Sequence, residues 1–145
     1  MANSQPALPE TVTINGQHYA LAGLSEKARA QLDNLRFVES QLYLLNNRKV
    51  LTEAARTVYG NALADMLPEK KAPANRKNGI ILVDGERYLS DDFSEEAKVQ
   101  LFSLQFADAE LLRLRNEEAV AGTAKARYLA LLAQELEGVE PLRQQ

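Results

Sequence analysis

Few side chains in this 145-residue sequence have a type and spacing that could do chemistry. His18 is the only histidine, and a single imidazole without a partner motif is weak evidence for a general base. We interpret it as a solvated strand residue on the face opposite Tyr19. The absence of cysteine excludes disulfides and cysteine-ligated metals, which fits a reducing compartment.

A second candidate is the acidic group Asp91, Asp92, Glu95 and Glu96, which falls where a helix is expected to begin. Carboxylates bind hard cations, but this spacing matches no calcium loop. Acidic residues near a helix N-terminus also interact favourably with the helix dipole. We therefore interpret the group as helix capping and expect no metal.

A third candidate is a small basic cluster, made of Lys70, Lys71, Arg76 and Lys77, which we interpret as a solvated linker. The chain carries 17 basic and 20 acidic residues, whereas nucleic-acid binders usually have a basic excess. No GxGxxG, P-loop, HExxH or GxSxG pattern occurs. The sequence therefore predicts no enzyme activity, no cofactor and no nucleic-acid partner.

The N-terminal residues 1–10 lack the basic and apolar regions of a secretory signal, and we expect this segment to be disordered. No apolar run approaches the roughly 18 residues that a membrane helix needs. These observations predict a soluble, cytoplasmic protein that does not bind a membrane.

The strongest pattern in the sequence is an internal repeat, and repeats should be identified before any single site is interpreted. Residues 12–64 align without a gap with residues 81–133, at an offset of about 69. Matched pairs include Tyr19 with Tyr88, Ser25 with Ser94, Leu35 with Leu104, Phe37 with Phe106, Tyr59 with Tyr128, and Leu63 with Leu132. We infer a tandem duplication: repeat 1 (11–67), a polar linker (68–79), repeat 2 (80–138) and a C-terminal tail (139–145).

Each repeat is predicted to begin with a β-hairpin. Asn15-Gly16 and Asp84-Gly85 favour two-residue type I′ turns, because both turn positions need a positive φ. Such a turn places Val12, Ile14 and Tyr19 on one face. A lone hairpin is marginal in water, so this face should pack on the helix that follows.

The remainder of each repeat is predicted to be one long amphipathic helix. Ser25 and Ser94 are the expected N-caps, and the helices should end near Met66 and Leu136. Apolar residues three and four apart give the heptad pattern of a coiled coil or bundle helix. The predicted interaction stripe comprises Leu35, Leu42, Leu45, Lys49, Tyr59 and Leu63 in repeat 1, and Leu104, Leu111, Leu114, Glu118, Tyr128 and Leu132 in repeat 2.

Two further features of the helices lead to expectations. Phe37 and Phe106 occupy matched positions, and aromatic residues at helical spacing are usually packing groups. Asn46-Asn47 weakens the first helix locally, so a kink or break near Asn46 is an alternative to a continuous helix.

The linker limits how the two helices can pair. Its 12 or so residues span at most about 40 Å when extended, whereas a helix of about 40 residues is about 60 Å long. A parallel pair would need the chain to return the whole helix length, so we expect an antiparallel pair. Lys49 then approaches Glu118 near the middle of the helices.

The hairpin "I-x-[ND]-G-x-x-Y" followed by a "LSEEAKxQLxxLQFVDAE"-like helix resembles a family of small bacterial and phage-associated proteins, known as a domain of unknown function. Here the matches are Ile14-Asn15-Gly16 with Tyr19, then Leu24 to Pro68, and "FSEEAKVQLFSLQFADAELLRL" in repeat 2. The family has no established activity. Its members look like single units, so the resemblance implies that this chain is a covalent dimer of one unit.

The predicted fold is α+β, mainly α, with two tandem hairpin–long-helix units whose helices pair antiparallel as a coiled coil or bundle. Leu44, Leu51, Val58 and Leu131 lie on the backs of the stripes and suggest homodimerisation or docking on another protein. The predicted function is a non-enzymatic interaction or assembly protein. The alternative is a small regulator, of the phage-related kind, that blocks another protein through one helical face.

Lys49 and Glu118 occupy matched positions of the two repeats and carry opposite charges, which leads to a first prediction. Lys49→Glu should weaken the helix pairing by repulsion from Glu118, and adding Glu118→Lys should restore it. Thermal unfolding of the wild type and the two variants measures this. If the double variant melts no higher than the single one, the two side chains do not face each other.

Overall fold

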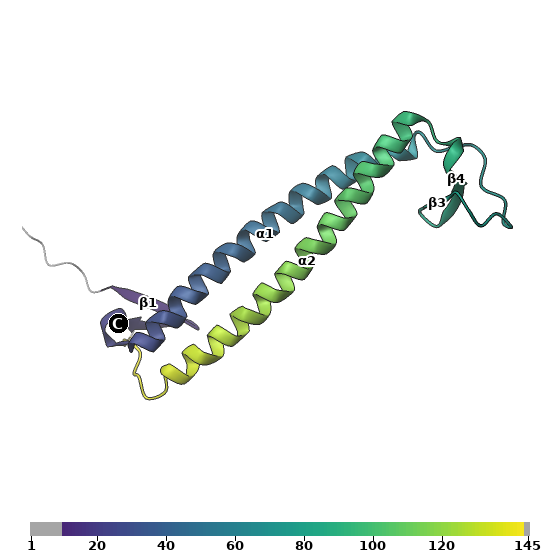
Figure 1. The fold of residues 1–145 in the computed structure, drawn as a ribbon. Helices are drawn as coiled ribbons and strands as arrows, with labels where there is room; N and C mark the ends of the chain where they lie inside the picture. The colour runs from purple at the N-terminus through teal and green to yellow at the C-terminus, as the bar shows by residue number, and fades with distance from the viewer. Residues whose placement is uncertain (1–9, 144–145) are drawn as a thin grey trace, which may run out of the picture. The chain divides into compact units, whose positions relative to one another are not determined.

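The structure, a computed structural model, describes residues 10–143. Predictions for residues 1–9 and for positions 144 and 145 of the tail lie outside the described residues. The chain is α+β and mainly helical, with two β-hairpins and two long helices that pack against each other (Figure 1). In chain order the elements are β1 (Thr11–Ile14), β2 (Gln17–Ala20), the 3-10 turn η1 (Leu21–Gly23), α1 (Glu26–Ala64), β3 (Ile80–Val83), β4 (Glu86–Leu89), the 3-10 turn η2 (Ser90–Asp92) and α2 (Glu95–Glu135).

These elements form two compact units, and each unit draws on both predicted repeats. The first, which we name the hairpin-1 unit, comprises residues 10–43 and 118–143. The second, the hairpin-2 unit, comprises residues 44–117. Each unit therefore contains one hairpin, one half of α1 and one half of α2, so its boundaries differ from those of the repeats.

The two hairpins confirm the predicted turns and register. Asn15 and Asp84 have φ of 51° and 48°, and the glycines that follow them are also positive. In the first hairpin Val12 is opposite Tyr19, and in the second Ile81 is opposite Tyr88. Both tyrosines are buried. The two-residue turns thus set a register that places one face of each hairpin against the helices.

The helices begin at the predicted serine caps. The backbone N–H of Ala28 donates to Ser25 Oγ over 3.0 Å, and that of Ala97 donates to Ser94 Oγ over 3.1 Å. These bonds satisfy an N–H that a helix terminus otherwise leaves unpaired. Helix α1 is continuous through Asn46, so the alternative of a break there is not what the structure shows.

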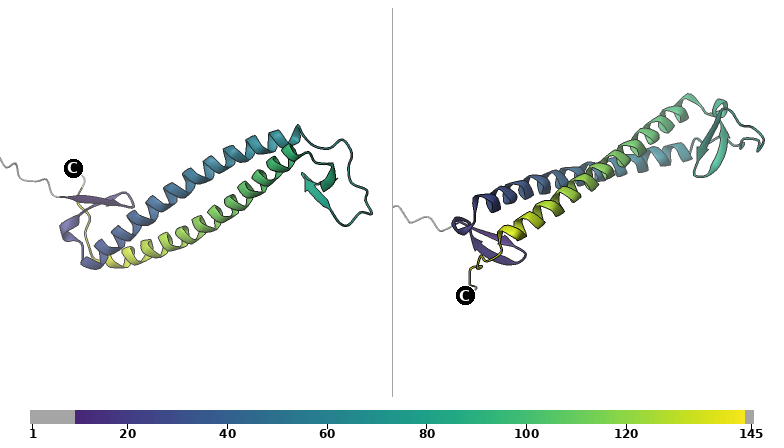
Figure 2. Two further views of the ribbon diagram at one scale, coloured as in Figure 1. Left: turned by 45° about the horizontal axis from the view of Figure 1, so that its top comes forward. Right: turned by 60° about the horizontal axis from the view of Figure 1, so that its bottom comes forward.

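In the hairpin-1 unit the start of α1 lies beside the end of α2 (Figures 1 and 2). Ser25 Oγ donates to Glu135 Oε2 over 3.1 Å, and Lys125 Nζ is 3.8 Å from Glu39 Oε1. Residues further along α1 thus meet residues earlier in α2, so the two halves run antiparallel. The buried core joins the hairpin and both helices: Ile14, Tyr19, Leu24, Ala28, Leu32, Leu35, Val38 and Leu132.

In the hairpin-2 unit the end of α1 pairs in the same sense with the start of α2. Arg56 forms an ion pair with Asp108, and a Cβ at Gly60 would lie 4.0 Å from Leu104 Cδ1. Leu63, Tyr88, Phe93 and Ala97 form the buried core. The rings of Tyr88 and Phe93 meet edge to face, with centroids 6.0 Å apart.

The segment that follows each helix is held by the second strand of a hairpin. Leu142 N–H donates to His18 O over 2.6 Å, and Ala72 N–H donates to Arg87 O over 2.8 Å. The Arg87 guanidinium also donates to the carbonyls of Pro73 (3.3 Å), Ala74 (3.1 Å) and Arg76. His18 is exposed, as predicted, and is hydrogen-bonded to Thr13. The predicted linker is therefore anchored through Arg87.

Two leucines on α2 test where the core lies. Leu114 is fully buried, whereas Leu112, two residues earlier on the same helix, is 61% exposed. Leu114→Ala should destabilise the protein by about 2–5 kcal/mol because it leaves a cavity. Leu112→Ala, the matched control, should change stability by no more than about 0.5 kcal/mol. Urea unfolding measures both, and equal effects would contradict this packing.

Candidate interaction surface

The residues of the predicted stripe lie where the two helices meet within each unit. Five are buried: Leu35, Leu63, Leu111, Leu114 and Leu132. The other seven are half-buried: Leu42, Leu45, Lys49, Tyr59, Leu104, Glu118 and Tyr128. The chain therefore uses this stripe for its own folding. Lys49 belongs to the hairpin-2 unit and Glu118 to the hairpin-1 unit, and their pairing stays a prediction.

A second line of apolar residues follows α1 on a different side. In the hairpin-2 unit Leu44, Leu51 and Val58 recur every seven residues, and their exposed fractions are 54%, 71% and 65%. Seven residues are nearly two helical turns, so these side chains lie on one face. We name them the outer line. Apolar side chains repeating along a helix at this spacing are typical of a helix-packing surface.

The expectation that Phe37 and Phe106 are packing groups is wrong within this chain, because each side chain is 67% exposed. Phe37 follows the buried Leu35 by two residues, which turns it about 160° away around the helix. The signal that could have identified the outer line was already in the sequence, since Leu44, Leu51 and Val58 recur every seven residues.

In the hairpin-2 unit the outer line continues onto α2. Val99, Phe102 and Phe106 are 61%, 72% and 67% exposed, and their spacing of three and four places them on one face of that helix. Together with Leu44, Leu51 and Val58 they make up what we name the outer face.

Charged residues support the placement of both apolar rows on the same side of the helix pair. Arg48 on α1 is near enough to Glu110 on α2 to lower its pKa. Arg48 is neighbour to Leu44 and Leu51 along α1, at spacings of four and three. Glu110 stands in the same relation to Phe106 on α2. The positive charge of Arg48 thus acts on a carboxylate that belongs to the other apolar row.

The centre of the outer face is a small charged network. The Arg113 guanidinium donates to both Glu110 and Glu117, with Arg113 Nε 3.0 Å from Glu110 Oε2. The hydrogen bond from Arg113 lowers the pKa of Glu110, partial burial opposes that shift, and the positive charges of Arg113 and Arg48 add to it. The same hydrogen bond raises the pKa of Arg113. Two arginines and two glutamates thus lie among six apolar side chains.

The opposite side of each helix pair is covered by the chain's own hairpin. In the hairpin-2 unit Leu101 and Leu104 pack against the core that contains Tyr88 and Phe93. Leu101 and Val99 are two residues apart, so their side chains point about 160° apart around α2. The hairpin therefore covers one side of the pair and leaves the outer face open.

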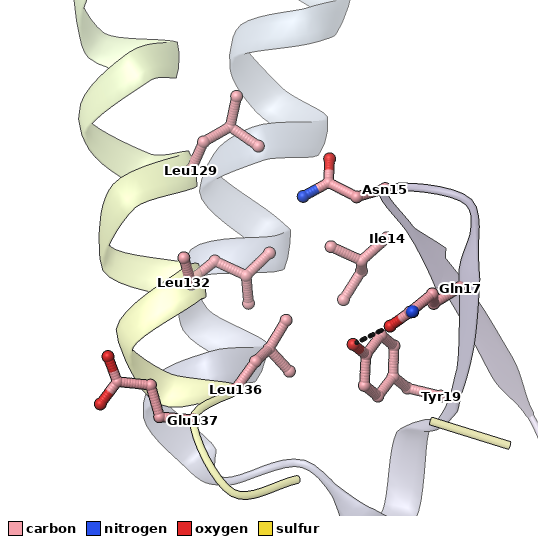
Figure 3. Close-up of a pocket in the computed structure, with 9 residues that line it drawn as sticks. Ile14, Asn15, Gln17, Tyr19, Leu129, Leu132, Leu136 and Glu137 are labelled. Carbon is pink, nitrogen blue, oxygen red and sulfur yellow. Dashed lines mark hydrogen bonds between the residues drawn. The ribbon is translucent and has the colours of Figure 1, made fainter. Parts of the chain in front are cut away.

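The hairpin-1 unit contains a groove of about 350 Å³ between the hairpin and α2 (Figure 3). Ile14 and Tyr19 line it from the hairpin, and Leu132 on α2 and Leu136 directly after α2 line it from the other side. Tyr19 Oη donates to Gln17 Oε1 over 3.0 Å. The walls are a mixture of polar and apolar groups, and the lining residues bring together no acid–base pair that could carry out proton transfer.

Residues 10–143 contain no group of three or more histidine, cysteine, aspartate or glutamate side chains placed to hold a metal ion. No helix of this described part is both long and apolar enough to cross a membrane. Comparison of the chain with protein-family models, curated proteins and solved structures returned no match. The resemblance to the small phage-associated family stays a hypothesis.

The charged network generates a prediction about pH. The folded-state pKa of Glu110 is lowered, so its carboxylate stabilises the fold above its unfolded-state pKa. That contribution is lost as the pH falls through the folded-state pKa. Between pH 7 and pH 3 the melting temperature of the wild type should therefore fall more steeply than that of Glu110→Gln.

Arg113→Gln provides the control, because it keeps the carboxyl group but removes the side chain that lowers its pKa. It should flatten the pH dependence in the same direction. Melting curves recorded by circular dichroism at one fixed protein concentration measure all three proteins. Parallel curves would show that Glu110 and Arg113 are not coupled in solution.

Proposed function

We propose that this chain is a non-enzymatic assembly protein that associates through its amphipathic helices, with a second copy of itself as the partner. The observation that carries the proposal is the outer line, where three large apolar side chains of the hairpin-2 unit recur every seven residues of α1 and are 54–71% exposed. Monomeric proteins rarely leave large contiguous apolar surfaces in water. A line with helical periodicity fits another helix better than a small molecule.

The proposal is supported by a difference in burial between two surfaces of the helices, the stripe and the outer line. The stripe that contains Leu35, Leu63 and Leu114 is buried within the chain, so it is not open to a partner. The outer line has the same heptad spacing but remains exposed. Association with a further helix pair would bury it and extend the present two-helix packing to four helices.

The tandem duplication and the coiled-coil character of the helices belong to the same proposal. Glu39 with Lys125 and Asp108 with Arg56 are equivalent ion pairs at the offset of 69 residues. The bond from Leu21 N to Glu10 O has its equivalent in the bond from Ser90 N to Gly79 O. Such matched contacts support an origin from a single unit that paired antiparallel with a copy of itself. The lack of cysteine fits a cytoplasmic location for this assembly.

The test is the solution mass of the wild type, measured by size-exclusion chromatography with light scattering over about a hundredfold range of concentration. A chain of 16.1 kDa that self-associates should give a dimer or larger species, with a weight-average mass that falls on dilution. A mass of one chain at every concentration would contradict self-assembly.

A further inference from the structure

We propose that the outer face of the hairpin-2 unit is the surface on which a second copy of this chain docks. The inference rests on the proposed function and assigns to it a particular surface and a pairing chemistry. The outer face consists of Leu44, Leu51 and Val58 on α1 and Val99, Phe102 and Phe106 on α2, each between 54% and 72% exposed.

The first argument is that this side of the unit is open. Hairpin 2 covers the other side, where Tyr88 and Phe93 pack with Leu63 and Leu104. The apolar rows of the outer face are instead turned away from that core by about half a turn of helix. The same helix pair is thus apolar on two sides, and the described residues of this unit cover only one of them.

The second argument is size. A stable interface buries about 800 Å² on each partner. Three of the six side chains of the outer face are large and are more than two-thirds exposed: Leu51, Phe102 and Phe106. With their apolar neighbours and the four charged side chains between them, they supply an area on the order of that value. Two helices set side by side also present a ridged surface that a second helix pair can interdigitate with.

The third argument is charge, which identifies the partner as a second copy. Arg113 pairs with Glu110 and Glu117 within the chain, and with Arg48 these side chains form a charged centre of two arginines and two glutamates that has no net charge. Burying this centre against a partner that brings an unbalanced charge would be costly. A partner must therefore offer acids and bases in equal number, at the centre of an apolar surface. The same patch on a second copy does so, because a twofold interface brings a surface onto itself.

The first experiment introduces a charge on the face. Leu51→Glu and Phe106→Glu should each raise the dissociation constant about a hundredfold or more, because each buries an unpaired carboxylate at the interface. Leu112→Glu is the matched control. Leu112 is 61% exposed on the same helix, but it lies about 120° around from Phe106. It should associate as the wild type does, and circular dichroism verifies that all three variants are helical.

The second experiment tests the second copy directly. The acidic variant Arg48→Glu/Arg113→Glu and the basic variant Glu110→Arg/Glu117→Arg should each be monomeric alone, because like charges meet across the twofold. Mixed in equal amounts, they should form a species with the summed mass of one chain of each, as measured by native mass spectrometry. Failure of the mixture to associate would overturn the second copy as the partner.

The outcomes separate this inference from the proposed function. A wild type that is monomeric at every concentration contradicts both. A wild type that self-associates while Leu51→Glu and Phe106→Glu keep its mass supports assembly but shows that this face is not the interface. Loss of association in these two variants, with Leu112→Glu unchanged, supports the face.

Discussion

The contact between the two helices is the interaction on which the rest of each unit depends. A two-stranded hairpin is not stable alone in water, and here Ile14 and Tyr19 are buried only because α1 and α2 present leucines to them. The helices need the same contact, since helices in proteins gain most of their stability from packing an amphipathic face. The hairpin, the helix caps and the anchored linker are all positioned by this seam.

The seam also contains charged residues, and these select its register. In the hairpin-1 unit Lys125 reaches Glu39, and in the hairpin-2 unit Arg56 forms an ion pair with Asp108. Such half-exposed pairs contribute only about 0–1 kcal/mol each. Shifting one helix by a single turn would, however, separate each cation from its carboxylate. Their effect is therefore on register and direction more than on stability.

The sequence predicts the local features well and the tertiary ones less well. The turns at Asn15 and Asp84 and the caps at Ser25 and Ser94 depend on neighbouring residues, so their sequence signals suffice. Asn46 costs a helix less than about 1 kcal/mol, which packing along α1 can outweigh. The anchoring of the linker by Arg87 escapes prediction because it depends on where the returning chain lies.

The candidate surface also depends on tertiary packing, which the sequence pattern alone does not predict. Heptad spacing tells which residues share a face of a helix, but α1 has two such faces, and spacing alone does not tell which one is buried. In the hairpin-2 unit the face of Leu63 is buried within the chain, whereas the face of Leu51 and Val58 stays exposed. The difference lies in what flanks them, because only the first face adjoins the hairpin. A hairpin that covers one side of a helix pair therefore also determines which side is left for a partner.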